Sequence, residues 1–585
     1  MAKYYDCIFL NIKKNKLQNL EKLNDNKIKV LTTNYVIYIY RSTSSGKIYI
    51  GQTNQFLNRH LQHYNGTEEK FNDANFNEVI VLHSYLFNGS ALDDIESQLI
   101  TYFNADKENA NKPFILYDTQ IINKNGGNRV SEYLGRENIS TDVILPFWEN
   151  VLYPNGWVET PTLEELRTRA LVKYSPIKQL TNEQILLIQE IINSPHKNYI
   201  INGDAGTGKT VLLTHLVAQI LNSKPNSKIG IVVQPNWEKI GKKIFKIFGM
   251  NSINLTVTTS TKLIADSSIF DVIIVDESHK LSRRGNKQMD AFNQVYLKLQ
   301  YSNCQSHLEI IQKLGKQIVL MYDILQAIRP ANISREEYQK LTINYEKRFL
   351  TTQFRIQPSK DKSYSSEDYV NGIKYLLYKD TGLLDSEFTK FNPNFNRDVF
   401  KDKSEDAYFG YFSTKPLHNM VDWLYEDRNC NPEHINRILA GLIEDWKQTD
   451  GKNINKKHFF EGDISRRWNS AQDNWINSDD VDAEEQIGSV FAVQGIDLNK
   501  VGVLIGNDLQ VDENGRLYGD PNNLRNVNCK FSKEKMPDPK NKFEFTLFVL
   551  NMYYVLMTRG IDGIRLGFWK NNTLQNYLEK TLDIK

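Results

Sequence analysis

The sequence predicts an α/β protein in which a small α/β unit is followed by two larger domains built on parallel sheets. Its 585 residues leave room for about four compact units. Between residues 34 and 130, a hairpin pattern is followed by two stretches of helical period. After Leu180, short apolar runs alternate with helical stretches, which is typical of parallel α/β sheets. We expect an N-terminal extension 1–33, the small unit 34–130, a connecting region 131–175, a first sheet domain 176–345 and a second sheet domain with insertions 346–585.

The composition indicates a globular protein and excludes several other classes. Hydrophobic residues make up 40% and charged residues 24% of the chain, which argues against wholesale disorder or a fibrous structure. No apolar run is long enough to span a bilayer and no secretory signal is visible, so we expect a cytoplasmic protein without membrane contact. The four cysteines show no CxxC spacing, which argues against a zinc knot or a disulfide scaffold. With a formal net charge of +2, binding to nucleic acid would need a local basic channel.

Five apolar runs predict buried strands in the two larger domains. They are NYIIN (198–202), IGIVV (229–233), DVIIVD (271–276), QIVLMYD (317–323) and VGVLIG (501–506). The connecting region, in contrast, lacks periodicity and is interrupted by three prolines. Residues 356–480 are polar and aromatic and carry few clear signals.

The small unit begins with a predicted hairpin whose strands cover residues 35–41 and 47–51. A four-residue loop would place Tyr38 opposite Tyr49, and a five-residue loop would shift the pairing by one. The register therefore stays open. In both cases we expect the two phenols to be near neighbours.

Two predicted helices follow the hairpin. In the first, residues 54–65, the apolar stripe is expected to consist of Leu57, Leu61 and Tyr64. Arg59 and His63 lie four residues apart and share another face of that helix. In the second helix, Glu96 borders a buried stripe made by Leu92, Ile95, Leu99 and Tyr102.

Two tyrosines, an arginine, a histidine and a carboxylate could form a site that cleaves phosphodiesters. A carboxylate can hold a hard divalent cation, an arginine can neutralise charge that develops on phosphate, and a phenol can move a proton. The alternative is that Tyr38 and Tyr49 are ordinary strand aromatics and Arg59 is an exposed helix charge.

The triplets Val36-Ile37-Tyr38 and Tyr49-Ile50-Gly51, ten residues apart, resemble the two signature triplets of the GIY-YIG endonucleases. Val36 stands where the family usually has a glycine. The resemblance implies that Glu96 carries a single divalent metal, Mg²⁺ or Mn²⁺, that Tyr38 acts in proton transfer, and that Arg59 contacts the scissile phosphate. It further implies catalytic roles for Tyr49, for Asn123 as the family's late asparagine, and for His63 as the histidine of some restriction-enzyme members.

A phosphate-binding loop is predicted where the chain fits the pattern G-x-x-x-x-G-K-[ST] directly after the strand at 198–202 and before a helical stretch. Gly203, Gly206 and Gly208 let the backbone curl so that its amides point at phosphate oxygens. Lys209 then meets the β/γ charge, and Thr210 ligates Mg²⁺. The expected cofactors of this site are ATP and Mg²⁺.

A second motif of the nucleotide site ends the strand at 271–276. Asp276 would hold the magnesium through water, and Glu277 would polarise the attacking water. Together with the phosphate loop, this pair predicts hydrolysis of a nucleoside triphosphate.

The chain after Leu180 resembles the group 3 Schlafen-like superfamily 1 DNA/RNA helicases, which implies two RecA-like parallel-sheet domains. Six stretches carry the resemblance in the family's order, including Tyr322-Asp323-Ile-Leu-Gln326, Thr352-Gln-Phe-Arg355 and Tyr554-Val-Leu-Met-Thr558-Arg559. The resemblance implies that Gln184 reads adenine, Gln326 senses the γ-phosphate, Gln494 and Gly495 belong to the fifth motif, and Arg355 and Arg559 reach the triphosphate.

These observations and the two resemblances predict an ATP-dependent nuclease–helicase that translocates on or remodels nucleic acid and cuts it. By analogy with phage-defence and restriction proteins, we expect it to act in defence against phage. We expect DNA rather than RNA as the substrate, and leave open a homo-oligomer or an accessory defence protein as partner. Two alternatives stay open. One is a host DNA-repair helicase–nuclease, and the other is a nucleotide-gated sensor or scaffold that does not unwind.

Overall fold

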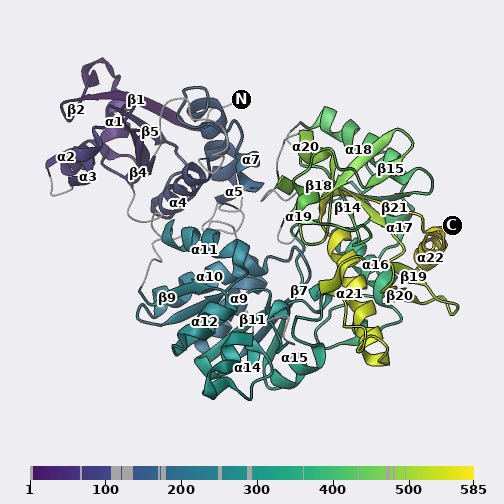
Figure 1. Cartoon of the computed structure of the whole chain (residues 1–585). Coiled ribbons are helices and arrows are strands. Elements are labelled where there is room, and N and C mark those ends of the chain that lie inside the picture. Colours follow the sequence, from purple (N-terminus) through teal and green to yellow (C-terminus); the bar gives the residue numbers. More distant parts are fainter. Residues whose placement is uncertain are drawn as a thin grey trace. The chain divides into compact units, whose positions relative to one another are not determined.

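A computed structural model shows a mixed α/β chain built on three principal sheets (Figure 1). The structure describes residues 4–65, 69–106, 120–121, 136–168, 172, 180–247, 253–285, 293–359, 361–432, 434–469, 475–477, 481–493 and 496–584. Residues 1–188 fall in one compact unit and residues 258–585 in another, and the segments between them are divided among the two. Within the described ranges, no helix is long and apolar enough to cross a membrane.

The N-terminal sheet has the strand order β2-β1-β5-β3-β4-β6. Its strands are β1 (Asp6–Lys13), β2 (Lys16–Leu17), β3 (Val36–Arg41), β4 (Lys47–Thr53), β5 (Glu78–His83) and β6 (Gln120–Ile121). All pairs are antiparallel except β4 with β6. Because β1 pairs with β5 along its length, residues 6–13 are part of this sheet and not a separate extension.

Side chains alternate between the two faces of this sheet, as the pleat of a β-strand requires. One face carries Tyr38 and Tyr40 and packs against α1 (Asp25–Thr33), α2 (Phe56–Asn65) and α3 (Glu69–Ala74). The other face carries Ile37 and Ile39 and packs against α4 (Gly89–Asp106). The stripe expected on α4 is buried, and Leu92, Ile95, Leu99 and Tyr102 are at most 4% exposed.

Helix α2 buries a different face from the one its apolar residues predict. Phe56, His60 and His63 are buried, whereas Leu61 is 55% exposed. The reason is that the two tyrosines of β3 offer hydroxyl partners to the histidine rings, so imidazole is the better match for this part of the core.

The segment expected to be a connecting region is helical and packed. It contains α5 (Arg136–Ile139), a π-helical turn (Ser140–Ile144), α6 (Leu145–Phe147), a second π-helical turn (Trp148–Leu152) and α7 (Leu163–Thr168). Trp148 is fully buried in the same hydrophobic cluster as α4, and its indole N–H donates to the Thr160 carbonyl at 2.9 Å. Burial of large aromatic side chains therefore orders a stretch that lacks regular periodicity.

The first core sheet is parallel and has the order β12-β7-β11-β10-β8-β9. Its strands are β7 (Tyr199–Gly203), β8 (Ile229–Val232), β9 (Leu255–Thr258), β10 (Phe270–Val275), β11 (Gly315–Tyr322) and β12 (Glu346–Leu350). The helices of the same stretch of chain are α9 (Asn182–Asn193), α10 (Lys209–Ser223), α11 (Pro235–Ile247), α12 (Ser260–Asp266), α14 (His307–Leu314) and α15 (Arg335–Leu341). Because β12 pairs with β7, the first core domain extends beyond residue 345.

The second core sheet has the order β13-β21-β18-β14-β17-β16-β15. Its strands are β13 (Phe409–Phe412), β14 (Arg437–Ala440), β15 (Phe459–Glu461), β16 (Ile464–Trp468), β17 (Gln486–Gly488), β18 (Leu498–Ile505) and β21 (Gly560–Phe568). Its main helices are α16 (Ser366–Tyr378), α18 (Pro416–Cys430), α21 (Pro539–Met557) and α22 (Asn572–Leu582). Many aromatic residues of 356–480, including Tyr369, Tyr378 and Tyr408, form part of the core of this domain.

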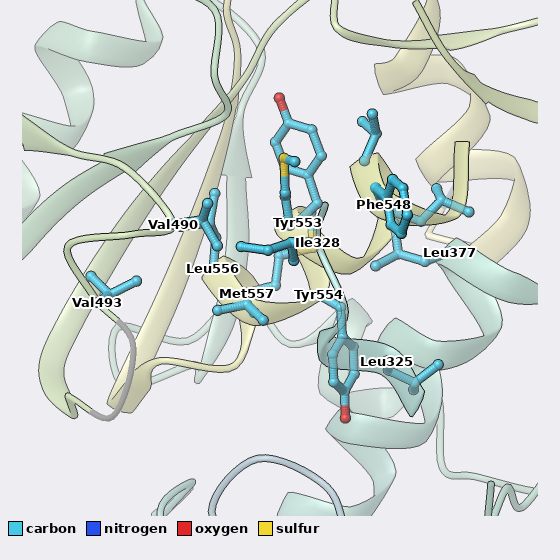
Figure 2. Packing of buried hydrophobic residues seen from close by; sticks show 14 of the residues in the cluster. Leu325, Ile328, Leu377, Val490, Val493, Phe548, Tyr553, Tyr554, Leu556 and Met557 are labelled. Carbon is cyan, nitrogen blue, oxygen red and sulfur yellow. The ribbon is translucent and has the colours of Figure 1, made fainter. Parts of the chain in front are cut away.

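Helix α21 is apolar on all sides over most of its length, as expected of a helix that lies inside a core. Figure 2 shows Phe548, Tyr553, Tyr554 and Leu556 of α21 in one cluster with Leu377 of α16 and with Leu325 and Ile328, which follow β11. Residues that follow β11 of the first core sheet thus share a hydrophobic core with the second core domain.

Candidate active sites

The register of the N-terminal hairpin differs from both predicted alternatives, because Tyr38 pairs with Gly51 and Tyr40 pairs with Tyr49. The Tyr38 ring lies over Gly51, where a Cβ atom would come within 2.5 Å of the ring and its hydroxyl. The Tyr38 ring therefore leaves no room for a side chain at position 51, and only glycine fits there. The expected proximity of Tyr38 and Tyr49 is confirmed, since their ring centroids are 6.3 Å apart.

Tyr38 and His63 form the centre of the first candidate site. The Tyr38 hydroxyl lies 2.9 Å from Nε2 of His63, and both residues are at most 1% exposed. The His63 ring stacks on Phe71 of α3 at 3.9 Å between centroids, with 8° between the planes. This stacking holds the imidazole in the orientation in which it can exchange a proton with the phenol.

Arg59 and Glu96 act electrostatically on the same phenol. Burial and the neighbouring Tyr49 raise the pKa of Tyr38, and the Glu96 carboxylate adds to this increase. The Arg59 guanidinium, which hydrogen-bonds the phenol, lowers the pKa of Tyr38, but burial prevails. The structure therefore brings Arg59 from α2 and Glu96 from α4 to Tyr38 and His63. Asn123 lies outside the described residues.

The carboxylate that could hold a metal in this site is Glu96, which is half-buried. In the part of the chain that the structure describes, no group of three or more His, Cys, Asp or Glu side chains forms a cation cage. A single half-buried carboxylate beside an arginine fits a divalent cation that takes its remaining ligands from phosphate oxygens and water.

A second tyrosine–histidine pair lies beside the first and was not predicted from the sequence. The Tyr40 hydroxyl lies 2.8 Å from Nδ1 of His60, and Nε2 of His60 lies 3.1 Å from the Asn15 carbonyl. Since a carbonyl only accepts, Nε2 of His60 carries the proton and Tyr40 donates to Nδ1. Residue spacing was the available signal, because Tyr40 follows Tyr38 by two on a strand and His60 precedes His63 by three on a helix.

The phosphate-binding loop lies between β7 and α10, as predicted. Gly206 and Gly208 have φ values of +88° and +80°, which favour glycine. The ammonium of Lys209 donates to the carbonyls of Gly203 and Asp204 and lies 3.9 Å from a carboxylate oxygen of Asp323. Thr210 follows in the first turn of α10. The lysine thus occupies the concave side of the loop, where its charge would meet phosphate.

Asp276 and Glu277 follow β10 as predicted and are strongly coupled. Burial and the adjacent Glu277 charge raise the pKa of Asp276 to about 7, although Lys209 and Lys280 act in the opposite direction. Burial also opposes ionisation of Glu277, but Lys280 and His279 outweigh it and hold its pKa well below the usual value. The raised pKa of Asp276 fits a carboxylate whose charge a divalent cation would compensate. The magnesium roles of Asp276 and Thr210 stay predictions.

Residues of the third motif face the same site. Gln326 donates to the Asp323 carboxylate at 2.6 Å, and both side chains are buried. Burial raises the pKa of Asp323, and Lys209 counteracts this effect. His279, which was not predicted as a site residue, lies 3.0 Å from a carboxylate oxygen of Glu277. Burial lowers the pKa of His279.

The two predicted arginines lie together in the second core domain, near residues 496–497. Arg355 forms an ion pair with Asp497 and donates to the Thr558 carbonyl at 3.2 Å. Arg559 is 3% exposed and donates to the carbonyls of Val555 at 3.1 Å and Ile496 at 3.4 Å. The transition-state roles of Arg355 and Arg559 stay predictions.

Gln184 takes part in the start of α9. Its side-chain oxygen accepts from the backbone N–H of Thr181 at 3.0 Å, and its backbone N–H donates to the Thr181 hydroxyl at 3.2 Å. This reciprocal pair is a capping box, which accounts for the local sequence pattern without a nucleotide. The role of Gln184 in adenine recognition stays a prediction. Gln494 and Gly495 lie outside the described residues.

The folds and the two sites together define a fusion of a GIY-YIG domain with a helicase core. Family models support both parts. The model described as "Schlafen group 3, DNA/RNA helicase domain" matches residues 196–569, more than half of the chain, so the protein belongs to this family. The model described as "GIY-YIG catalytic domain" matches residues 34–109.

Individual relatives are distant. An uncharacterized protein of Saccharomyces cerevisiae, YPL245W, is 25% identical over 453 residues, which cover 70% of this chain and 91% of the relative. The Pyrococcus furiosus Hef helicase domain has a TM-score of 0.31 and 11% identity over 71% of this chain and 99% of that chain. Bacteroides sp. Pif1 in complex with ADP-AlF4 has a TM-score of 0.29 and 13% identity, with coverages of 69% and 96%.

Proposed function

We propose that the protein is an ATP-dependent nuclease–helicase that moves along or remodels nucleic acid and cleaves it with a metal-dependent site, in defence against phage DNA. The observation that carries this proposal is the presence of two sites in one chain. Tyr38, His63, Arg59 and Glu96 converge in the N-terminal domain. The phosphate loop and the Asp276–Glu277 pair converge in the core domains.

In the nuclease site, the Tyr38 phenol is the group that moves the proton. Because the pKa of Tyr38 is raised, the phenol stays protonated and acts by relay. Its oxygen accepts a proton from the attacking water while its own proton passes to Nε2 of His63. Arg59 would offset the negative charge that develops on the phosphate. A divalent ion held by Glu96 would supply Lewis-acid activation of the phosphodiester.

In the motor site, Lys209 would bind the β- and γ-phosphates and Glu277 would orient the attacking water. Mg²⁺, held by Thr210 and Asp276, would neutralise phosphate charge. Arg355 and Arg559, which bind Asp497 and backbone carbonyls, would stabilise the transition state if they exchanged these acceptors for phosphate oxygens. Turnover would thus require a rearrangement near residues 496–497, which is how hydrolysis couples to movement of the second core domain.

The first test of the nuclease site is Glu96→Gln. Purified protein is incubated with Mg²⁺ and plasmid, linear, single-stranded and RNA substrates, with and without ATP. We expect Glu96→Gln to reduce cleavage by at least a hundredfold while DNA-stimulated ATP hydrolysis stays at the wild-type rate, because only the cation ligand is lost. Glu164→Gln, which changes an exposed glutamate of the same domain, is the control. Cleavage at the wild-type rate by Glu96→Gln would refute the metal assignment.

The first test of the motor site uses two separate variants, Lys209→Ala and Glu277→Gln. Lys209→Ala should abolish ATP turnover, whereas Glu277→Gln should bind ATP and hydrolyse it slowly, because only the water-orienting group is changed. Lys224→Ala, an exposed lysine just after α10, is the control. Strand displacement on a tailed duplex then separates a helicase from a nucleotide-gated sensor. Plaque counts for bacteria that express the wild type or either inactive variant test the role in defence.

A further inference from the structure

The carboxylate of Asp204 connects the phosphate loop to the second core domain. Asp204 follows the first glycine of the loop. The Lys374 ammonium of α16 donates to one of its carboxylate oxygens at 2.7 Å, and the Tyr554 hydroxyl of α21 donates to the other at 3.1 Å. We refer to Asp204, Lys374 and Tyr554 as the loop clamp.

The Lys374 side chain is buried and does not reach solvent. It is 1% exposed, and its ammonium also donates to the Lys390 carbonyl at 2.7 Å. Burying a lysine carries a desolvation penalty unless an anion and further acceptors compensate it. Asp204 is that anion, and α16 therefore holds the side chain of a loop residue whose backbone carbonyl binds Lys209.

The charge of Asp204 acts on the rest of the nucleotide site. It contributes to the raised pKa of Asp323 and to the raised pKa of Tyr554, although burial is the largest cause for both groups. Without a cation beside it, Asp204 would add a further negative charge to a site that must accept a triphosphate. Lys374 compensates this charge.

The two residues after Asp204 are also held from outside the loop. The Gln353 side chain donates to the Ala205 carbonyl at 2.8 Å, and the Phe354 amide donates to the Gly206 carbonyl at 3.0 Å. A Cβ atom on Gly206 would overlap the Gln353 side chain. Ala205 and Gly206 therefore contact the segment that leads into the second core domain. Asp204, the residue before them, contacts that domain itself.

We propose that Lys374 is a positioning residue of the nucleotide site, which holds the phosphate loop through Asp204 and makes nucleotide binding and turnover depend on the second core domain. This inference rests on the proposed ATPase. Lys374 acts through Asp204 and needs no contact with the nucleotide.

The test measures the affinity for a fluorescent ADP analogue with Mg²⁺, which requires no turnover. Lys374→Met should weaken binding at least fivefold, because the Asp204 carboxylate loses its cation and the loop backbone relaxes. Lys379→Met is the matched control, since this lysine caps the end of the same helix and contacts Thr581 and the Tyr577 ring instead of the loop. Lys374→Arg keeps the charge and should bind within about twofold of the wild type.

A double-mutant cycle with Asp204→Asn separates positioning from a merely structural role. In the Asp204→Asn background, Lys374→Met should change the affinity by less than twofold, because the charge that it compensates is gone. An equal loss of affinity in both backgrounds would overturn the proposal, as would a Lys374→Met variant that melts earlier but binds like the wild type. If Lys374→Met does not fold, the affinities of three other variants carry the same test. Asp204→Asn and Asp204→Asn/Lys374→Met should differ by less than twofold, and Lys374→Arg should stay within about twofold of the wild type.

Turnover distinguishes this inference from the proposed function. A wild-type protein that binds the analogue but does not hydrolyse ATP would refute the proposed ATPase. The coupling between Lys374 and Asp204 in the affinity would still support or overturn the positioning role. Where turnover is present, Lys374→Met should lower kcat at least tenfold, and Lys379→Met should leave it unchanged.

Discussion

At the scale of single residues, close neighbours shape the chemistry of both sites. Tyr38 is an example, since its ring occupies the space that a side chain at position 51 would need. The phenol reaches His63 only because Gly51 lies beneath it. A residue without a side chain is thus part of the catalytic geometry.

We expect Gly51→Ala to lower the cleavage rate at least tenfold, because the added methyl group displaces the Tyr38 ring from His63. ATP hydrolysis should be unaffected. Cleavage and ATPase assays on the same preparation check this expectation. Gly89→Ala is the control, since a Cβ atom there meets nothing within 4 Å. Equal cleavage rates for the two variants would contradict the role assigned to the Tyr38 position.

Asp508 predicts a pH dependence of stability. It is fully buried, and its carboxylate accepts from the Tyr553 hydroxyl at 2.5 Å. Burial raises the pKa of Asp508 to about 6, from an ordinary value of 3.8. The folded state thus binds the proton more tightly than the unfolded state, so stability falls as pH rises from about 4 to about 6.

At about 1.4 kcal/mol for each pH unit between the two pKa values, this loss is on the order of 2 to 3 kcal/mol. Asp508→Asn removes the titrating group and should flatten this part of the stability profile. Urea unfolding of the wild type and the variant at pH 4 to 7 measures the difference. Parallel profiles for the two proteins would show that Asp508 does not titrate in this range.

At the scale of elements, α21 connects the motifs of the nucleotide site. The buried Asn551 side chain donates to the Ala327 carbonyl at 2.7 Å and accepts from the Tyr378 hydroxyl at 2.8 Å. One turn later, Tyr554 contacts Asp204 of the phosphate loop. The same helix thus contacts the loop after β11 and the phosphate loop, and it ends just before Arg559.

Asn551→Leu should destabilise the protein by about 2 to 4 kcal/mol, because it leaves two buried polar groups without their partner. Urea unfolding followed by tryptophan fluorescence measures this change. Lys542→Leu, on an exposed position of the same helix, should change the free energy of unfolding by less than about 0.5 kcal/mol. A similar small effect for Asn551→Leu would show that water replaces the lost contacts.

At the scale of the whole molecule, the two proposed activities belong to separate domains, and their ligands should act separately. Mg²⁺–ADP at a hundred times its dissociation constant should stabilise the core domains by about 2.7 kcal/mol, since only the folded state binds it. Hydrogen exchange should then slow in β7, β10 and β11. Exchange in β3 and β4 should stay unchanged. Equal protection of β3 and β4 would indicate that the nucleotide state also reaches the nuclease domain.

Local patterns determined much of this protein. The buried strands β7, β8, β10, β11 and β18 coincide with apolar runs in the sequence, because a parallel strand covered on both faces must be apolar throughout. The phosphate loop was also predictable, because its residues are consecutive in the chain and phosphate binding needs these residue types in this order. The residues alone left a site of Tyr38, Arg59, His63 and Glu96 open beside the alternative of ordinary strand aromatics, and the resemblance to a family favoured the site.

Only the tertiary structure decided how distant residues meet. The hairpin register, the burial of His60 and His63 in place of Leu61, and the packing of residues 136–168 depend on neighbours from other elements. The contact of Asp204 with Lys374 joins residues 170 positions apart. No sequence pattern marks such a pair, because the desolvation that makes a buried lysine require its carboxylate exists only once the surrounding core has formed.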